Sequence, residues 1–149
     1  MILLIQRYYW IISIIVVSCL YSSNFDPYKE FTIRDGFIGG SVNSIFQDSQ
    51  HKLWFCTSEG VSIYDAETFS NLTQSTVLPF HNVTIGLEDK LNQIWLGTQD
   101  GLIRITDSKI DTFYVEDGLL SNEIIDIVEW RNELWVLTSN GISTFRNNL

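Results

Sequence analysis

The chain has few of the residues that mark several common protein classes. It contains two cysteines, Cys19 and Cys56, and two histidines, His51 and His81. Two cysteines cannot build a disulfide framework, and two histidines far apart lack the further ligands that a metal site needs. No cluster of Lys and Arg occurs, and the formal charge of -9 argues against a phosphate backbone as partner. The sequence therefore predicts no metal and no nucleic-acid partner.

Catalytic motifs are also lacking. The chain has neither a Gly-x-Ser-x-Gly elbow nor a phosphate-binding loop. Asp48 and Asp89 recur at equivalent places, as do Glu59 and Asp100. Because such recurrence is structural by default, we interpret all four as solvated turn residues and not as an acid–base pair. The sequence predicts no enzyme and no cofactor.

A long apolar run occurs only at the N-terminus. Residues 1–20 carry a single charge, Arg7, and the run from Tyr8 to Leu20 is shorter than the roughly 20 residues that a membrane-spanning helix needs. The run fits a secretory signal, with an uncleaved anchor as the alternative. The sequence "VVSC", which ends at Cys19, resembles a bacterial lipobox and would make Cys19 a lipidation site. In each case we expect the rest of the chain to be exported.

Tryptophan and glycine recur at a fixed period in the remainder. The stretches "LWFCTSEGVSIYD", "IWLGTQDGLIRIT" and "LWVLTSNGISTFR" begin at Leu53, Ile94 and Leu134. A period near 40 residues indicates a repeat architecture. The third copy is one residue shorter, in a turn between Ile124 and Trp135. The residues that define the repeat are Trp54, Gly60, Trp95, Gly101, Trp135 and Gly141.

Each copy has the local pattern of β-structure. Short runs rich in β-branched and apolar residues alternate with polar turns, and no helical periodicity of useful length follows residue 20. We expect the turns that contain Gly101 and Gly141 to be type I′ hairpins, with positive φ at the preceding residue as well. Glu59-Gly60 fits the same turn less well, because the left-handed conformation is unfavourable for glutamate. The earlier turn of each copy has His51, Asn92 or Asn132, which tolerate positive φ.

Four antiparallel strands in about 40 residues are typical of a propeller blade. The fourth run is present after the first two copies, and a similar run, "KEFTI", precedes the first. We predict an all-β fold: a signal or anchor over residues 1–20, then a partial β-propeller of about three four-stranded antiparallel blades over residues 21–149. The repeats span approximately residues 31–73, 74–115 and 116–149. One blade hides its apolar faces only against another, and the tryptophans fill the space between blades.

These motifs resemble the two-component regulator propeller repeat, whose pattern reads roughly "DGL-x-x-N-x-V-x-x-I-x-x-D-x-x-G-x-LW-x-GT-x-x-G-L". The match includes Asp117-Gly118-Leu119 and Ile94-Trp95-Leu96-Gly97-Thr98. Cys56 and Leu137 replace the usual glycine before threonine, and Gly86 replaces the isoleucine of the other copies. A glycine there leaves either a small hole or a close approach of the backbone.

The resemblance implies an extracytoplasmic sensor of bacterial signal transduction. The expected function is non-catalytic ligand sensing by a fragment or truncated receptor that lies in the periplasm or on the outer face of the membrane. The resemblance implies oligosaccharides as the class of ligand. The expected partners are a carbohydrate ligand and a signalling protein or missing receptor domains. A protein–protein interaction or structural module that senses nothing is the alternative, and a propeller-type enzyme ranks below both.

Aromatic side chains are the candidate ligand-binding residues. Phe80 and Trp130 are expected in or near connections and not at repeat positions, and Tyr64 is expected late in a third strand. All three could stack on sugar rings, with packing between blades as the alternative. Three blades also leave two open edges and exposed apolar faces, since propellers typically close with about four to eight blades. We therefore expect the chain to self-associate through its open blade edges or to behave as a partly ordered monomer.

Overall fold

The computed structural model describes residues 28–74, 78–79 and 81–146. The chain divides into an N-terminal unit, Met1–Glu30, and a larger unit, Phe31–Leu149. The predicted signal or anchor over residues 1–20, with its lipidation candidate Cys19, lies outside the described residues. Within the described ranges, no helix has both the length and the apolar character needed to cross a membrane.

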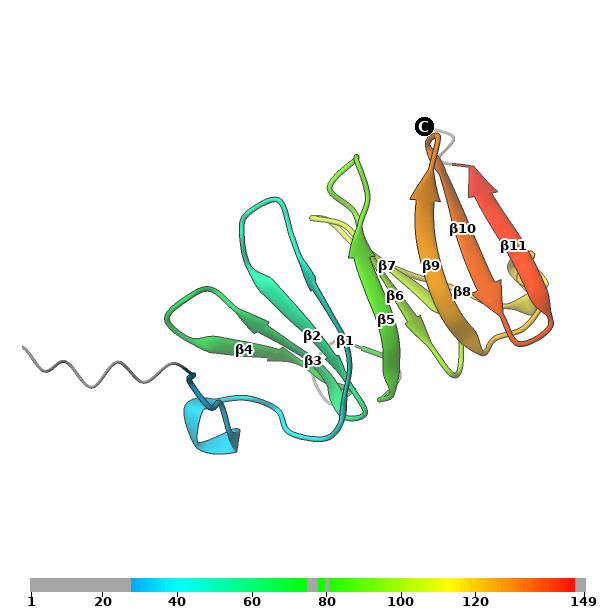
Figure 1. The fold of residues 1–149 in the computed structure, drawn as a ribbon. Helices are drawn as coiled ribbons and strands as arrows, with labels where there is room; N and C mark the ends of the chain where they lie inside the picture. The colour runs from blue at the N-terminus through cyan, green and yellow to red at the C-terminus, as the bar shows by residue number, and fades with distance from the viewer. Residues whose placement is uncertain (1–27, 75–77, 80, 147–149) are drawn as a thin grey trace, which may run out of the picture. The chain divides into compact units, whose positions relative to one another are not determined.

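Three antiparallel sheets make up the larger unit, and we call them blade 1, blade 2 and blade 3 (Figure 1). Neighbours in the chain are neighbours in each sheet, so every blade is a meander. Blade 1 consists of β1 (Val42–Gln47), β2 (Leu53–Thr57), β3 (Gly60–Tyr64) and β4 (Phe69–Leu72). Blade 2 consists of β5 (Val83–Glu88), β6 (Ile94–Thr98), β7 (Leu102–Ile105) and β8 (Ile110–Phe113). Blade 3 has three described strands, β9 (Ile124–Trp130), β10 (Glu133–Thr138) and β11 (Gly141–Arg146).

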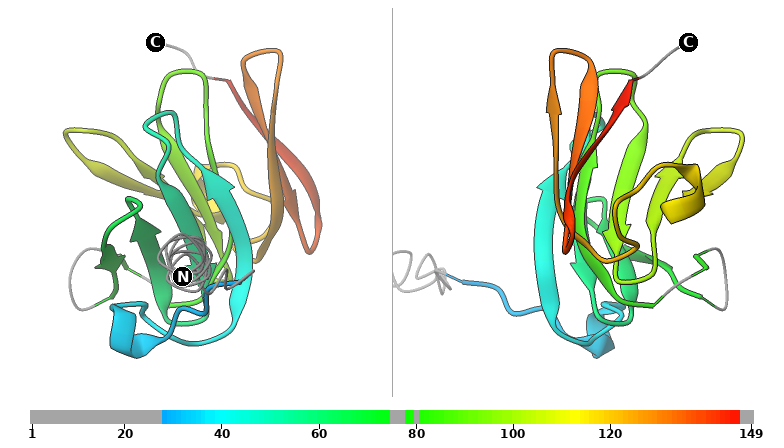
Figure 2. Two further views of the ribbon diagram at one scale, coloured as in Figure 1. Left: turned by 60° about the vertical axis from the view of Figure 1, so that its left-hand side comes forward. Right: turned by 90° about the vertical axis from the view of Figure 1, so that its right-hand side faces the viewer.

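The first strands of the blades lie next to one another. β1 packs against β5, and β5 packs against β9 (Figures 1 and 2). The later strands of each sheet diverge from this inner row, as the views in Figure 2 show. The stacking of sheets therefore follows the order of the chain, as a blade repeat requires.

The turns between the first two strands confirm the expected positive φ. His51 has φ 66°, Asn92 has φ 59° and Asn132 has φ 65°. In blade 3 the turn shortens to Arg131-Asn132, because Trp130 pairs directly with Glu133. Arg131 also has positive φ, at 50°, so this two-residue hairpin has the two left-handed residues of type I′. The missing residue of the third copy lies in this turn.

The prediction of type I′ hairpins at the repeat glycines is wrong. Gly60, Gly101 and Gly141 have φ of 132°, 149° and 134°, but the residues before them do not have positive φ. The turn is organised instead by the threonine that ends the preceding strand. In blade 1 the Thr57 hydroxyl donates to the Gly60 carbonyl at 3.0 Å and accepts from the Glu59 N–H at 3.1 Å. Thr98 and Thr138 make the same pair of bonds in the other blades.

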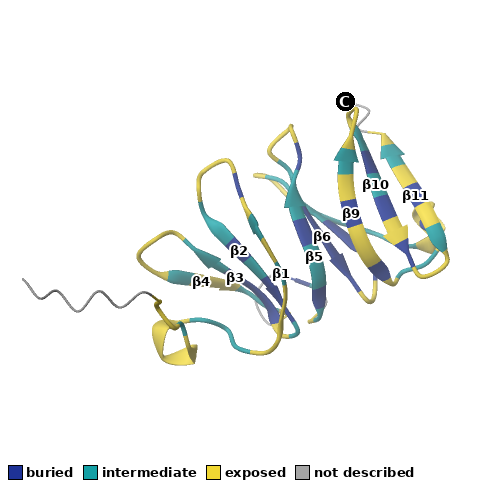
Figure 3. Cartoon of the chain, viewed as in Figure 1, coloured by how far each residue is buried: buried dark blue, intermediate teal, exposed yellow. Residues whose placement is uncertain are grey.

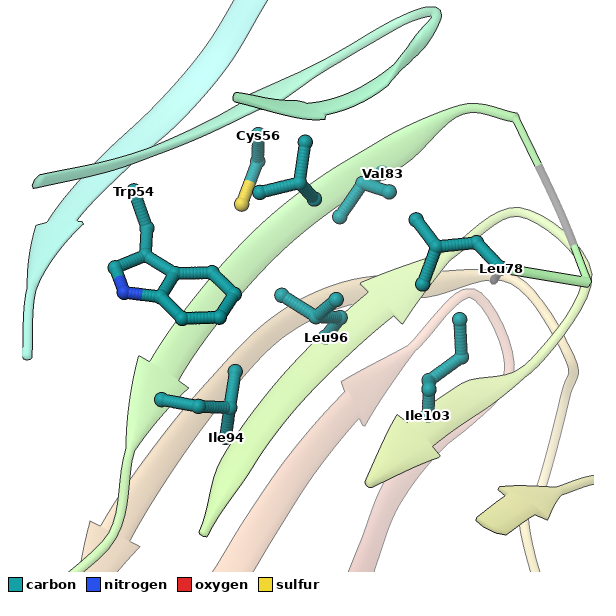
Figure 4. Packing of buried hydrophobic residues seen from close by; sticks show 8 residues of the cluster. Trp54, Cys56, Leu78, Val83, Ile94, Leu96 and Ile103 are labelled. Carbon is teal, nitrogen blue, oxygen red and sulfur yellow. The ribbon is translucent and has the colours of Figure 1, made fainter. Parts of the chain in front are cut away.

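The two faces of blade 2 belong to two different apolar cores. Ile94, Leu96 and Ile103 face blade 1 and pack with Trp54 and Cys56 (Figure 4). The other face of the sheet packs against blade 3, through Trp95 and Leu102 of blade 2 and Ile124, Ile127, Leu134 and Val136 of blade 3. Alternation along each strand separates the two sets, since successive side chains point to opposite faces. Buried residues consequently concentrate in the middle blade (Figure 3).

A glycine permits the close approach at each of these interfaces. A Cβ on Gly86 would lie 2.5 Å from Phe46 Cε1 and 3.0 Å from Cys56 Sγ. A Cβ on Gly97 would lie 2.6 Å from Ile124 Cγ2. Gly86 therefore marks a close approach between blades and not a hole. The two glycines come from different strands, β5 and β6.

A short lead-in precedes the first and third blades. Each lead-in contains a 3₁₀ turn, Ile33–Asp35 or Val115–Asp117, followed by a left-handed glycine. The Ile38 N–H donates to the Ser62 hydroxyl, and the Leu120 N–H donates to the Ser143 hydroxyl, both at 3.0 Å. These bonds attach each lead-in to the third strand of its own blade.

Candidate functional site

Two buried carboxylates organise the loops at one end of blades 1 and 2. Asp48 Oδ1 accepts from the N–H groups of Gln50 and Lys52, and Asp48 Oδ2 accepts from Trp54 Nε1 at 2.8 Å. Asp89 makes the equivalent bonds to the loop and to Trp95 Nε1, also at 2.8 Å. Asp48 is 8% exposed and Asp89 is 4% exposed. The prediction that they are solvated turn residues is therefore wrong, whereas Glu59 and Asp100 are exposed as expected.

Blade 3 lacks this carboxylate. Trp130 occupies the position of Asp48 and Asp89, six residues after Ile124 as they are after Val42 and Val83. Trp135 Nε1 is buried but has no hydrogen-bond partner among the described residues. Loss of the carboxylate and shortening of the turn therefore occur together in the third copy.

A cleft of about 330 Å³ lies between blades 1 and 2 at the same end as the carboxylates. One wall comes from the turn after β1, and the other comes from the turns after β5 and β7. Amide, ammonium and carboxylate groups line it together with the apolar side chains of Trp54, Ile94 and Ile105. The residues that carry this character are Gln50, Lys52, Trp54, Glu88, Asn92 and Asp107.

Hydrogen bonds between blades hold the walls of this cleft together. The Ser49 N–H and hydroxyl both donate to the Glu88 carboxylate. The same arrangement occurs one blade further, where the Lys90 N–H donates to Glu129 Oε2 at 3.2 Å and Lys90 Nζ lies 3.6 Å from Glu129 Oε1. A group that binds in the cleft therefore contacts residues that link two blades.

The aromatic candidates from the sequence do not come together. Tyr64 ends β3 and packs in an aromatic cluster, with ring centroids 5.0 Å from Phe31 and 4.8 Å from Phe69. Its hydroxyl donates to the Ala66 carbonyl. Trp130 ends β9 in a different blade, and Phe80 lies outside the described residues. The sequence interpretation placed Trp130 in a connection, but it occupies a repeat position in a strand.

Trp130 belongs to an exposed apolar face on blade 3. Its ring is 51% exposed, lies edge-on to Trp135 with centroids 5.8 Å apart, and is covered by the Arg131 guanidinium at 4.5 Å. Val128, Leu137 and Ile142 are also exposed, and with Trp135 they line one hollow on the same face. We call these residues, with Trp135, the open face of blade 3. A shallow apolar hollow of about 180 Å³ lies on it.

The other chemically active side chains do not form a reaction centre. Cys56 is fully buried in the core between blades 1 and 2, and this burial raises the pKa of its thiol to about 11. Over the ranges that the structure describes, no group of three or more His, Cys, Asp and Glu side chains could hold a metal ion. His51 is in an exposed turn, and His81 lines a separate hollow near the other end of the blades.

The cleft residues were missed by the sequence interpretation. The available signal was the aspartate six residues before Trp54 and again before Trp95, a spacing that is absent in the third copy. A carboxylate at constant distance from a buried indole predicts a hydrogen bond and hence an ordered loop. The ordered loop then positions Gln50 and Asn92 at the cleft.

Comparison with known families confirms the resemblance seen in the repeat motifs. Residues 36–59 match the family described as Two component regulator propeller. No curated protein matches the chain.

Solved structures with the same fold are much longer proteins. The extracellular domain of the hybrid two component system BT3049 from B. thetaiotaomicron matches with a TM-score of 0.71 and 21% identity over 80% of this chain and 17% of that chain. The extracellular domain of the one component system BT4673 from the same organism gives 0.63 and 21% over 79% of this chain and 16% of that chain. PorZ, a surface component of the type-IX secretion system of Porphyromonas gingivalis, gives 0.60 and 26% over 73% of this chain and 18% of that chain. The chain thus spans less than a fifth of these proteins, and the expected all-β partial propeller is confirmed.

Proposed function

We propose that the chain is a non-catalytic, ligand-sensing propeller module of bacterial signal transduction that acts outside the cytoplasm. The observation that carries the proposal is the stack of three blades with the architecture of extracellular two component domains. The repeat family supports the same role. An apolar N-terminal run that fits a signal or anchor supports an exported location.

The proposed ligand is an oligosaccharide, bound in the cleft between blades 1 and 2. Sugar rings offer hydroxyl groups on their edges and apolar C–H groups on their faces. The cleft offers amides and carboxylates around the Trp54 ring, which can satisfy both kinds of surface. Its cationic groups are few, so it does not favour a phosphate or a nucleic acid.

The proposed mechanism is a change of packing between blades. Glu88 and the loop that begins at Ser49 come from neighbouring blades and already contact each other across the cleft. A ligand that contacts both walls stabilises one separation of the blades over another. It transmits a signal only to the extent that it binds one of those two states more tightly.

Isothermal calorimetry of the full chain against a panel of oligosaccharides tests this proposal. Gln50→Ala removes one exposed amide, and Asn92→Gly removes another while suiting the positive φ at that position. Each is expected to weaken a binding sugar about three- to tenfold, as expected for one lost hydrogen bond. Asp100→Ala, an exposed turn substitution at the other end of blade 2, is the matched control and leaves the affinity unchanged.

A module that only binds protein is the second candidate function, and the open face of blade 3 favours it. Heat of binding for one sugar class, reduced by both cleft variants, supports sensing. Absence of heat for every sugar, together with a defined protein partner, supports the interaction module.

A further inference from the structure

We propose that the open face of blade 3 docks onto the outer face of blade 1 in a second copy of this chain, so that two copies close a ring of six blades. The proposal concerns assembly and does not depend on the sensing function. It rests on the repetition of one interface within the chain. That interface occurs between blades 1 and 2 and again between blades 2 and 3.

The open face of blade 3 is the repeat equivalent of surfaces that are buried elsewhere. Trp135 corresponds to Trp95, which is 1% exposed against blade 3, and Ile142 corresponds to Leu102, which is 0% exposed. On blade 3 Ile142 is 56% exposed, and no described residue covers it. The face therefore has the composition of an interface without a neighbouring blade.

Blade 1 carries the complementary surface. Val42 and Ile45 correspond to Ile124 and Ile127, which blade 3 buries against blade 2, but on blade 1 they are 44% and 57% exposed. At the start of the lead-in of blade 1, Phe31 lies in the position that its equivalent has at an internal interface. Phe31 packs on Tyr64 at 5.0 Å, as the equivalent Phe113 packs on Phe145 at 5.3 Å between blades 2 and 3.

Polar residues at the edge of the proposed interface continue the donor–acceptor pattern of the internal interfaces. Across the existing interfaces the loop residues Ser49 and Lys90 donate to Glu88 and Glu129. The next pair in this series is Arg131 of one copy and Gln47 of the second copy. The side-chain carbonyl of Gln47 can accept from Arg131, so the rim offers a donor to an acceptor and no like charges.

The lack of an interface glycine makes the contact between copies, which we call the joint, looser than the blade interfaces within the chain. Leu137 replaces Gly97, and Ile45 replaces Gly86, so neither side provides the glycine that each internal interface has. The extra side-chain atoms hold the blades further apart, which weakens association relative to intrachain packing. Two such joints form at once in a closed pair, and six blades lie within the usual range of about four to eight.

Cysteine cross-linking in the full chain, with Cys19→Ser throughout, tests the register. A Cβ on Gly97 would lie 3.0 Å from Ile124 Cβ, near the roughly 3.5–4.5 Å between the Cβ atoms of a disulfide. The equivalent positions across the joint are Leu137 and Val42. We expect a mixture of Leu137→Cys and Val42→Cys chains to form a mixed disulfide dimer, and each variant alone to form much less.

Sedimentation velocity supplies a second readout. Ile142→Asp places a charge on the open face and is expected to weaken dimerisation at least about tenfold, because the charge must be buried unpaired. Leu91→Asp, at an exposed apolar residue in the β5–β6 turn, is the matched control and leaves dimerisation unchanged. A dimer joined through two Leu137→Cys residues overturns the head-to-tail arrangement. A monomer at all concentrations, or open-ended filaments, overturns the closed pair.

Discussion

Asp89→Ala tests whether the buried carboxylate holds a blade together. The substitution removes the acceptor for two loop N–H groups and for Trp95 Nε1. The Trp95 ring is 1% exposed, so water cannot readily replace the lost partner. An unsatisfied buried donor costs about 1–3 kcal/mol, and the two loop donors, which are near solvent, add about 0.5–1 kcal/mol each. The expected loss is about 3 kcal/mol, a large part of the 5–15 kcal/mol by which domains are typically stable.

Asp89→Asn separates the hydrogen bonds to the loop N–H groups from the hydrogen bond to Trp95 Nε1. The asparagine oxygen continues to accept from the loop N–H groups, but its amide N–H₂ group then faces the indole N–H. We expect about 1–3 kcal/mol of destabilisation, less than for alanine. In a Trp95→Phe background the cost of Asp89→Asn should fall, because the conflicting donor is gone.

Urea unfolding of the full chain followed by far-ultraviolet circular dichroism measures these differences. Asp100→Ala in the same blade is the control, since Asp100 is exposed and its substitution should change stability by less than about 0.5 kcal/mol. If Asp89→Ala were as stable as this control, the carboxylate would have no structural role and the assignment would be refuted.

Three further predictions concern packing and titration. Gly97→Ala places a Cβ 2.6 Å from Ile124 Cγ2, so calorimetry should show a loss of about 1–3 kcal/mol, and an unchanged Tm would mean that the blades separate freely. Burial raises the pKa of Cys56 to about 11 from 9.0, so its stabilising effect is present below pH 9 and is lost as the pH rises toward 11; thiol labelling at pH 8 should be slow until urea unfolds the chain. The hydrogen bond from Arg104 lowers the pKa of Asp111 from 3.8, so this contribution is present above that value and is lost as the pH falls below it. Asp111→Asn should flatten the acid limb of the stability profile, and an unaltered limb would show that the ion pair does not matter.

The strand order and the stacking of blades could be predicted from the sequence because they depend on features that repeat. The regular spacing of Trp54, Trp95 and Trp135 aligned the three repeats in the sequence. The positive φ in the first turns could be predicted because His and Asn tolerate it. The second turns could not be predicted from residue pairs. Their conformation depends on a threonine hydroxyl that bonds within the turn, and such a bond competes with the hairpin type that glycine alone suggests.

The site was less accessible to sequence reasoning than the fold. Residue type alone predicts that Asp48 is solvated, because unpaired aspartate is rarely buried. Its burial depends on three donors that fold around it, one of which comes from a tryptophan on the next strand. The cleft depends on two blades at once, so residues 34 or more positions apart in the chain determine it, as with Trp54 and Glu88. Trp130 was misplaced because the shortened turn hid its equivalence to the two aspartates.

The two interface glycines have a consequence for how such a repeat can evolve. Gly86 is on β5, on the face of blade 2 that packs against blade 1, whereas Gly97 is on β6, on the face that packs against blade 3. Setting blade 3 directly before a copy of blade 1 would bring Leu137 against Ile45 with no glycine between them, whereas duplicating blade 2 would set Gly97 against Gly86 and leave a gap. Shuffling or duplicating a unit of this gene thus requires a matched substitution in the adjoining unit, even though every unit has the same outline.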